Sequence, residues 1–313
     1  MTDQDNSGLS VISFPGTGNL THFAATENGY YSDEGLAVEL TPTPNSVYQI
    51  TNTVAGEFNI ASTAIDNIVA YQEGQGAVEL DSEPDLFVFM GGSQIDLSFV
   101  VQPGIESFAD LKGKSLAVDA LSTGFAFVLY QMLEDGGLGA DDYTLASVGG
   151  TDKRWDSIKA GEHAGSLMND PFSGFALAAG FRLLASSAEM LEHYQSGVFA
   201  ASRAWAAAHR AEVVGFIRAN IRAVDWVLDP ANRDAAAEML IRNMPALSAD
   251  GAAGAVAKLV SPRTGYTPKA GLDHAGIETV LALRSRYAEP QKSLTDPDRY
   301  LDMSYYEEAL SSL

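Results

Sequence analysis

The chain has 313 residues, 46% of them hydrophobic and 19% charged, which excludes a disordered or fibrous protein and suits two lobes better than one small core. It contains no cysteine, so disulfides, thiolate nucleophiles, iron–sulfur clusters and cysteine-bound zinc are excluded. With 41 acidic and 19 basic residues the net charge is −22, which makes nucleic acid and anionic membranes poor partners.

The negative charge is concentrated at the start of the chain. No Lys or Arg occurs in residues 1–111, which hold 16 acidic residues, whereas the remainder holds 25 acidic and 19 basic ones. The simplest interpretation is a surface tuned for solubility, and a salt-adapted source is an alternative. A third interpretation is that this part of the protein receives a cationic or neutral ligand.

Strand and helix patterns alternate at short intervals through the first part of the chain. We predict strands at residues 9–14, 37–40, 58–61 and 86–90, and helices at 19–28, 47–55 and 67–73. Strands that alternate with helices of this length indicate βαβ units and a mostly parallel sheet.

A second alternating set follows and then gives way to helices alone. Strands are predicted at 98–101, 115–118, 144–148, 165–168, 182–185 and 197–201, with a turn at 108–111 and helices at 123–133, 154–160 and 171–179. Alanine-rich helices are predicted at 203–228, 233–243, 250–259 and 271–287. The sequence therefore predicts an α/β protein of two lobes, with a chain that crosses between them more than once and ends in a helical region.

No apolar run reaches the roughly 18 residues that a membrane span needs, so no direct insertion into a membrane is expected. No basic-then-apolar leader follows Met1. We therefore expect that an export leader has been removed or never existed, and the segment from Met1 to Gly8 looks like a natural cytoplasmic start.

The loops after the predicted strands share a composition that is small, polar and rich in glycine. They comprise residues 15–19, 62–67, 91–93, 121–124, 149–152 and 169–171. In open parallel sheets, ligands bind beyond the carboxyl ends of the strands and at helix N-termini. We therefore expect one binding site in a cleft between the lobes.

Four segments in order resemble one protein family. Residues 28–39, NGYYSDEGLAVE, are similar to the G-F/Y-F/Y-x-x-E-G-L-x-V segment of bacterial substrate-binding proteins of the sulfonate, taurine and thiamine-pyrimidine-precursor type. The segments 56–61 (GEFNIA), 108–118 (FADLKGKSLAV) and 161–165 (GEHAG) resemble the next three motifs of that family.

The resemblance implies a type II periplasmic-binding-protein fold, an α/β arrangement of two doubly wound lobes that close on a small molecule at a hinge cleft, with a helical C-terminal region. On this basis we expect a first lobe of residues 1–94 and 197–313, and a second lobe of residues 95–196.

In the first lobe, the expected ligand contacts follow strands or lie near helix starts. They are Gly16, Thr17, Asn19, His22, Tyr48, Ser62, Thr63, Asp66 and Ser93. Asp66 would bind an amine, a guanidine or a ring N–H, unless it only caps the next helix. Asn19 has the same capping alternative, and a lone histidine such as His22 is often structural.

In the second lobe, the expected contacts are Ser122, Thr123, Gly124, Thr151, Arg154, Asn169, Asp170 and Phe172. Hydroxyls and free N–H groups at 122–124 suit an anionic or carbonyl oxygen, and the resemblance implies that this loop meets the acidic head of the ligand. Asp170 would accept from a ligand N–H while Phe172 supplies an aromatic face. Lys153 or Arg154 would hold a carboxylate or sulfonate, unless both are merely exposed.

Three functional hypotheses remain. The first, favoured by the resemblance, is a periplasmic or extracellular solute-binding protein that carries a small organic molecule (nitrogenous, pyrimidine-like, amine or small acid) to the permease of an ABC importer. The second is a cytoplasmic enzyme on the same fold, a decarboxylase, a dehydratase or a pyrimidine-precursor-related enzyme, with His22, Asp66, Lys153 and Asp170 as acid–base candidates. The third is a ligand-sensing domain for a signalling partner.

Other kinds of chemistry lack a motif. The chain lacks the cysteine-rich motif of the eukaryotic pyrimidine-precursor synthases, and the histidines after residue 160 show no metal-ligand spacing, so neither a metal nor a cofactor is expected. Because residues 1–111 have no basic side chain, the wall they form is expected to disfavour a strongly acidic ligand. Asp66→Asn is then expected to weaken a cationic ligand and to spare an anionic one.

Overall fold

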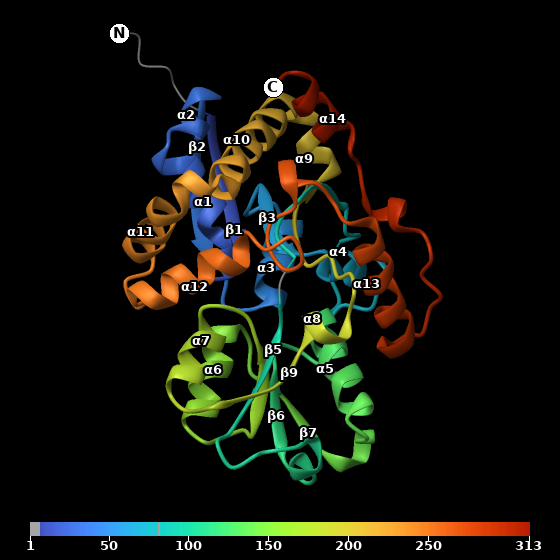
Figure 1. The fold of residues 1–313 in the computed structure, drawn as a ribbon. Helices are drawn as coiled ribbons and strands as arrows, with labels where there is room; N and C mark the ends of the chain where they lie inside the picture. Colours follow the sequence, from blue (N-terminus) through green and yellow to red (C-terminus); the bar gives the residue numbers. More distant parts are fainter. Residues whose placement is uncertain (1–6, 81, 95) are drawn as a thin grey trace.

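The computed structural model describes residues 7–80, 82–94 and 96–313 as two α/β lobes stacked one above the other (Figure 1). The strands are β1 (Ser7–Ser13), β2 (Leu36–Pro42), β3 (Ile60–Ala64), β4 (Leu86–Gly91), β5 (Ser98–Val101), β6 (Ser115–Val118), β7 (Thr144–Ser147), β8 (Gly165–Met168), β9 (Arg182–Ser186) and β10 (Gly197–Ser202). The predicted two-lobe α/β architecture is confirmed. The start at Met1 and the lobe boundary at residue 95 lie outside the described residues.

The two sheets share one topology. The first has the strand order β2-β1-β3-β10-β4, and the second has the order β7-β6-β8-β5-β9. In each sheet four strands run the same way and one runs against them: β10 is antiparallel to β3 and β4, and β5 is antiparallel to β8 and β9. These two are the strands on which the chain arrives from the other lobe. Because the chain changes lobe just before each of these strands, we propose a first lobe of residues 1–94 and 197–313 and a second lobe of residues 95–196.

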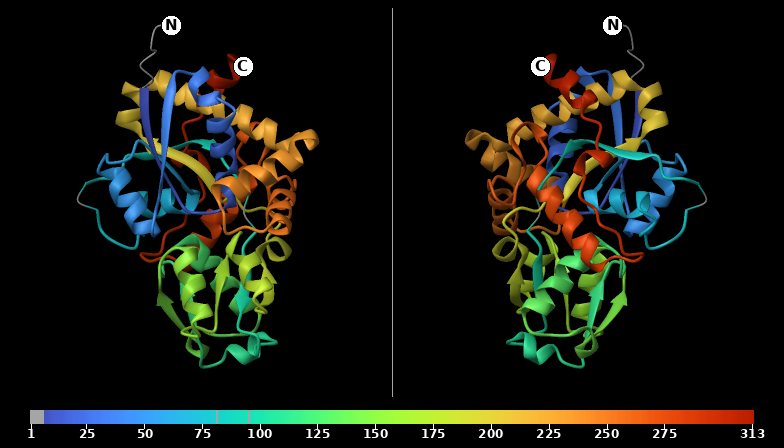
Figure 2. Two further views of the ribbon diagram at one scale, coloured as in Figure 1. Left: turned by 90° about the vertical axis from the view of Figure 1, so that its left-hand side faces the viewer. Right: turned by 90° about the vertical axis from the view of Figure 1, so that its right-hand side faces the viewer.

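Helices cover both sheets, and those after residue 202 lie around the first sheet (Figures 1 and 2). The α-helices are α1 (Leu20–Glu27), α2 (Tyr30–Asp33), α3 (Ser46–Val54), α4 (Ile65–Gln72), α5 (Gly124–Asp135), α6 (Thr151–Lys159), α7 (Phe172–Ala178), α8 (Ser187–Met190), α9 (Arg203–Ala208), α10 (Arg210–Leu228), α11 (Arg233–Asn243), α12 (Ala249–Leu259), α13 (His274–Tyr287) and α14 (Ser304–Ser311). The helix predicted at 203–228 is thus two helices, because the backbone leaves the helical conformation at His209 (φ −125°, ψ 38°).

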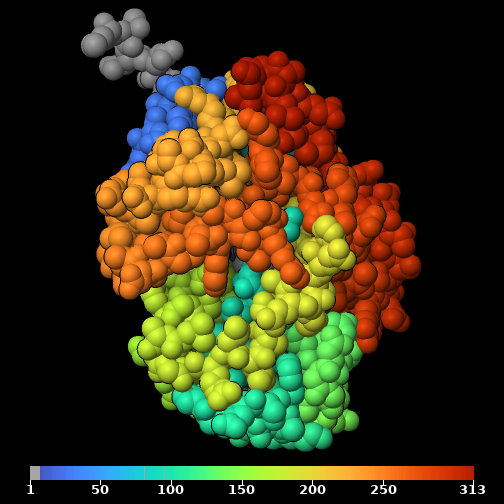
Figure 3. Space-filling model, in the orientation of Figure 1, coloured from blue at the N-terminus to red at the C-terminus, as the bar shows by residue number. Residues whose placement is uncertain are grey.

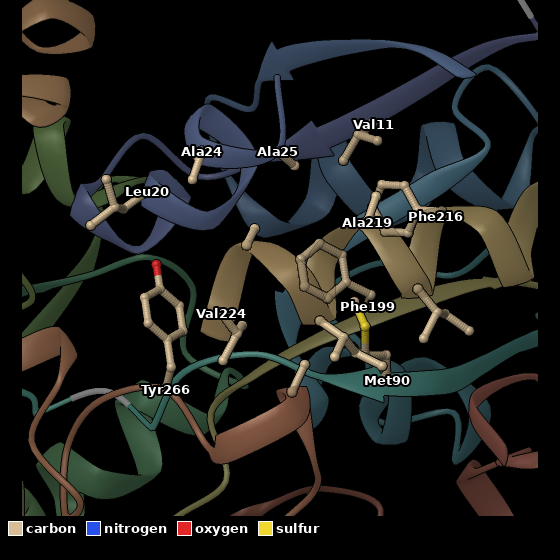
Figure 4. Close-up of a cluster of buried hydrophobic side chains, with 14 of the residues drawn as sticks. Val11, Leu20, Ala24, Ala25, Met90, Phe199, Phe216, Ala219, Val224 and Tyr266 are labelled. Carbon is tan, nitrogen blue, oxygen red and sulfur yellow. The ribbon is translucent and has the colours of Figure 1, made fainter. Parts of the chain in front are cut away.

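One hydrophobic core lies within the first lobe, between its sheet and α1, α10, α11 and α12. Phe216 on α10 packs within it, with ring centroids 5.5 Å from Phe199 and 6.3 Å from Phe89, and Figure 4 shows it beside Val11. Burial of such aromatic side chains fixes the C-terminal helices on the first sheet.

A second hydrophobic core crosses from one lobe to the other. It includes Ile68 and Val88 in the first lobe, Phe99 and Phe127 in the second, and Val280 on α13, all with at most 1% of their surface exposed. The lobes are therefore joined through packed side chains on the side where α4, α13 and α5 meet, as well as through the two crossings of the chain. Among the described residues no helix is both long and apolar enough to cross a membrane.

Candidate functional site

A cavity of about 150 Å³ lies between the lobes. Its walls are the residues after β1, β3 and β4 from the first lobe, those after β6 and β8 from the second, and the starts of α5 and α6. The end of α12 and the turn after it close another side, above the second lobe in Figure 3. A cavity on the order of 150 Å³ can hold a ligand about as large as benzene.

Most of the residues expected at a ligand line this cavity. They are Gly16, Thr17, Asn19, Ser62, Thr63, Asp66, Ser93, Thr123, Gly124, Thr151, Arg154, Asn169 and Asp170. Strand register explains why distant loops meet: Ser13 at the end of β1 pairs with Ser62 on β3, so the loops beyond both strands leave the sheet at one level. That these residues contact a ligand stays a prediction.

His22 lies outside the cavity. It is buried on α1, with Nδ1 3.3 Å from the hydroxyl oxygen of Tyr31, and that hydroxyl is 3.2 Å from Nδ2 of Asn220 on α10. Burial lowers the pKa of His22 to about 4, so the imidazole is neutral at pH 7. The expectation that His22 faces the cleft is corrected, because α1 turns this side towards α10.

Tyr48 and Ser122, two other residues expected to contact a ligand, do not line the cavity. Tyr48 is 43% exposed on α3, outside the cavity wall, and its backbone N–H donates to the Asn45 side chain that caps this helix. Ser122 is also absent from the wall, and its carbonyl oxygen accepts from the Arg284 guanidinium at 2.8 Å. The β6–α5 loop thus presents Thr123 to the cavity in place of Ser122.

Phe172 and Lys153 are the remaining corrections. Phe172 packs edge-on against Phe175, with ring centroids 6.0 Å apart, in the hydrophobic cluster behind the cavity. Lys153 has 59% of its side chain exposed and lies 3.8 Å from Asp152. Neither lines the cavity, so neither stacking by Phe172 nor anion binding by Lys153 is available there.

Asp66 forms a buried ion pair instead of capping its own helix. Its two oxygens accept from Nε and Nη2 of Arg284 on α13, both at 2.8 Å, and the side chains of the pair are 2% and 0% exposed. Asp66 Oδ2 also accepts from the backbone N–H of Gly124, at the start of α5. The N-terminus of α5, which we expected to hold an acidic ligand head, is therefore occupied by a carboxylate from the other lobe.

Asn19 does not cap a helix either. Its Nδ2 donates to the carbonyl oxygen of Phe14 at 2.9 Å, and its Oδ1 accepts from the Ser13 hydroxyl at 2.7 Å. These two bonds hold the β1 loop in the curved shape that brings Gly16 and Thr17 to the cavity wall.

Asp170 and Lys258 bridge the lobes at another edge of the cavity. Lys258 Nζ on α12 lies 2.7 Å from Asp170 Oδ2, with 46% of the lysine side chain and 16% of the aspartate exposed. The first lobe therefore does bring a basic side chain to the cavity wall. It comes from α12 in the C-terminal region and not from residues 1–111, so the expectation that a strongly acidic ligand is disfavoured stays a prediction.

Arg154 is buried, with 3% of its surface exposed, and donates to protein acceptors. Its Nε bonds to the Gly149 carbonyl at 3.1 Å, its Nη2 to Thr151 Oγ1 at 2.8 Å, and its Nη1 to Ser166 Oγ at 3.1 Å and to the Leu167 carbonyl. Burial lowers the pKa of Arg154 to about 10, which still leaves the guanidinium charged at pH 7. Arg154 thus fixes the loops of the second lobe.

Direct hydrogen bonds between the lobes surround the cavity. Gly150 N–H donates to the Pro44 carbonyl at 3.0 Å, and Ser46 N–H donates to Asp119 Oδ2 at 3.2 Å. Elsewhere the backbone of Thr17 approaches the Asp170 carbonyl to 3.4 Å. The structure therefore has its lobes in contact, around a small interior space.

Several wall residues were not expected. They include Phe14, Asp119, Ser196, Phe199, Lys258 and Tyr266. Asp119 directly follows the strand at 115–118, so the strand-end rule that found the other loops applies to it as well. Tyr266, whose hydroxyl donates to the Gly18 carbonyl at 2.8 Å, comes from a region whose helical pattern says nothing about the cleft. Within the described residues no cluster of His, Asp and Glu side chains is arranged to hold a metal ion.

Comparison with known proteins gives a family and a fold. The family model described as the NMT1-like family matches residues 5–241. No curated protein matches the sequence.

The structure is similar to the periplasmic nitrate-binding protein NrtA from Synechocystis PCC 6803 (TM-score 0.81, 12% identity, 99% of this chain and 89% of that one). It is also similar to a zinc-bound ligand-binding component of an ABC-type import system from Staphylococcus aureus (TM-score 0.79, 13% identity, 97% and 99%). A third similar structure is the desulfurization enzyme DSZB (TM-score 0.64, 15% identity, 98% and 99%). The predicted periplasmic-binding-protein fold is thereby confirmed.

Proposed function

The chain belongs to the NMT1-like family, and from that premise we propose that it is a solute-binding protein that captures a small organic molecule between its lobes for an ABC importer. The observation that carries this proposal is the cavity itself, which both lobes enclose with the loops at their strand ends. A ligand that contacts both lobes favours the closed form over the open one, which is the signal a permease needs. No covalent chemistry is required.

The proposed setting and ligand follow from the same hypothesis. A binding protein for an importer works in the periplasm or outside the cell, and its partner is the permease that contacts the lobes around the cleft. We propose a nitrogenous ligand, pyrimidine-like or an amine, in preference to a small acid, because Lys258, the one lysine among the wall residues that the structure describes, is already paired with Asp170.

A thermal-shift screen of amines, betaines, pyrimidines, carboxylates and sulfonates tests the proposal. A ligand at a hundred times its dissociation constant stabilises the folded state by about 2.7 kcal/mol, so a binder raises the melting temperature clearly. Thr264→Trp, which fills space at the wall, is expected to abolish the shift, whereas Pro262→Trp, exposed on the same turn, is expected to leave it unchanged. A screen in which no compound shifts the wild-type protein contradicts the proposal.

An enzyme on the same fold is the second candidate, favoured by the likeness to DSZB along nearly the whole chain. Of its expected acid–base residues, His22 and Lys153 lie outside the cavity, and Asp66 and Asp170 are in ion pairs. Recovery of a bound compound unchanged after long incubation supports binding alone. Conversion of the compound over many turnovers supports the enzyme and contradicts the transport proposal.

A further inference from the structure

We propose that Asp119 is the specificity-determining residue of the cavity, and that it accepts hydrogen bonds from a cationic or N–H-rich ligand, an amine, amidine or guanidine. This inference rests on the proposed function and names the ligand class that the same site selects. Asp119 follows β6 in the second lobe and lines the cavity, although the expected acidic contacts were Asp66 and Asp170.

Four carboxylates line the cavity in the described part of the chain, and they differ in what they already bind. Asp66 is bound to a buried guanidinium, and Asp170 to a lysine. Asp96 Oδ1 accepts from the Ser186 hydroxyl at 2.6 Å and from the N–H of Ala188 at 3.4 Å. Asp119 has only its Oδ2 engaged, by a backbone N–H of α3.

The other oxygen of Asp119 is the atom on which the proposal rests. Asp119 Oδ1 is buried and has no hydrogen-bond partner among the described residues. An unpaired buried acceptor destabilises the protein, and more so when it is charged, so a ligand that donates to it recovers free energy. An anion placed there would meet a second negative charge instead.

Two other residues on the cavity wall also have a buried polar atom without a hydrogen-bond partner among the described residues. Asn169 Oδ1, beyond β8, and Ser196 Oγ, ahead of β10, are buried without a partner in the described part of the chain, and Ser196 is 1% exposed. The carboxylate and amide oxygens only accept, while the hydroxyl both donates and accepts. Asp119 and Asn169 belong to the second lobe, whereas Ser196 directly precedes β10 and its carbonyl accepts from the Ile65 N–H of the first lobe. A ligand rich in N–H groups therefore satisfies all three atoms only when the lobes are closed around it.

The positive charges of the wall are engaged in other contacts. Arg154 donates to four protein acceptors, and Lys258 is paired with Asp170. The charges of Asp66 and Arg284 cancel, as do those of Asp170 and Lys258. Of the other charged residues described on the wall, Asp96 and Asp119 are negative and Arg154 is positive, so the net charge of the wall is −1. The cavity therefore favours a cation on charge as well as on hydrogen bonding.

The experiment uses probes of matched shape and opposite charge. Benzamidinium is compared with benzoate, and methylguanidinium with nitrate, by thermal shift and titration calorimetry at pH 7 and constant ionic strength. We expect the cation of a pair to bind and raise the melting temperature, and its anion not to do so.

Variants assign the effect to one residue. Asp119→Asn keeps an oxygen for the Ser46 N–H and is expected to melt near the wild-type temperature, yet to bind the cation at least tenfold more weakly, which is about 1.4 kcal/mol. Asp156→Asn removes the same charge from an exposed position on α6 and is expected to leave affinity unchanged.

If benzoate or nitrate binds more tightly than the cations, and Thr264→Trp abolishes that binding, this inference is overturned and the proposed function stands. Equal cation affinity in Asp119→Asn and wild type also overturns it. If neither the cations nor the anions bind, the inference is overturned. If no compound of the wider thermal-shift screen binds either, the proposed function is contradicted as well.

Discussion

The two lobes meet at two edges of the cavity that are built in different ways. At the α5–α13 edge, the first lobe presents the Asp66–Arg284 ion pair, with two parallel hydrogen bonds and side chains at most 2% exposed. This pair contacts the Gly124 N–H and the Ser122 carbonyl of the second lobe. The guanidinium carbon lies 5.0 Å from the ring centroid of Phe127, within a hydrophobic core that spans both lobes. At the α12 edge, the bridge is one bond from Lys258, whose side chain is 46% exposed, to Asp170.

The difference indicates which edge moves. Opening the α5–α13 edge would take the Gly124 N–H and the Ser122 carbonyl away from two buried charges, whereas the exposed Lys258–Asp170 pair exchanges one partner for water at little cost. Segments with few buried contacts open at low free energy. We therefore expect the α5–α13 edge to act as the pivot between the lobes and the α12 edge to be the mouth through which a ligand enters.

The largest effect is expected at the pivot. Arg284→Ala leaves Asp66 buried and charged, and is expected to lower the free energy of unfolding by about 3–5 kcal/mol. Arg286→Ala is the matched control on the same helix, because Arg286 is 56% exposed and also crosses to the second lobe, where it pairs with Glu134. Its expected loss is below about 1 kcal/mol. Similar losses for the two variants in urea unfolding would contradict a buried pivot.

A methyl group tests how closely the lobes are packed at this edge. A Cβ at Gly124 would lie 2.5 Å from Cγ of Asp66, so Gly124→Ala has to move the lobes or the ion pair. We expect a loss of roughly 1–3 kcal/mol, as for other overpacked sites, and increased amide exchange at the start of α5. Gly174→Ala on α7, where the nearest atom is 3.8 Å away, is expected to cause no loss.

Replacing both charges at the pivot separates charge from packing. In the double variant Asp66→Leu with Arg284→Met, no charge is left buried, and apolar side chains of similar size fill the space. Buried pairs replaced in this way are often neutral in stability, so we expect a loss within about 1 kcal/mol of wild type. A double variant as unstable as Arg284→Ala would show that the bonds from Arg284 to Ser122 and Gln75 contribute more than the charge balance.

The smallest effect on stability, and the clearest effect on motion, is expected at the mouth. Lys258→Ala is expected to cost less than about 1 kcal/mol, since its bridge is half exposed. Because the chain has no cysteine, fluorescent labels can be placed on Gly254→Cys in α12 and Gly174→Cys in α7 alone. Lys258→Ala is expected to lengthen the mean distance between these labels, and Arg286→Ala is not. An unchanged distance would place the mouth elsewhere.

The strand-end rule accounts for what could be predicted of the site. It identified the loops of both sheets because parallel strands bring their carboxyl ends to one level, a property visible in local sequence patterns. The partner of Asp66 could not be found in this way, since Arg284 is 218 residues distant and sits in a helix like its neighbours. Tyr266 and Lys258 were missed for the same reason: helical periodicity says nothing about which helix closes a cleft. The break at His209 likewise has no Pro or Gly to signal it.

The position of β10 in the middle of the first sheet, between β3 and β4, has a consequence for synthesis. The second sheet is made of one continuous stretch, from β5 to β9, and is complete as soon as that stretch has left the ribosome. The first sheet has to wait for residues 197–202. Three carboxylates of the first lobe, Glu27, Glu34 and Asp66, remain unpaired for longer still. Their partners are Arg242, Arg218 and Arg284, which are synthesised later than β10. The nascent chain therefore carries a strongly acidic, unfinished N-terminal third until the last helices emerge.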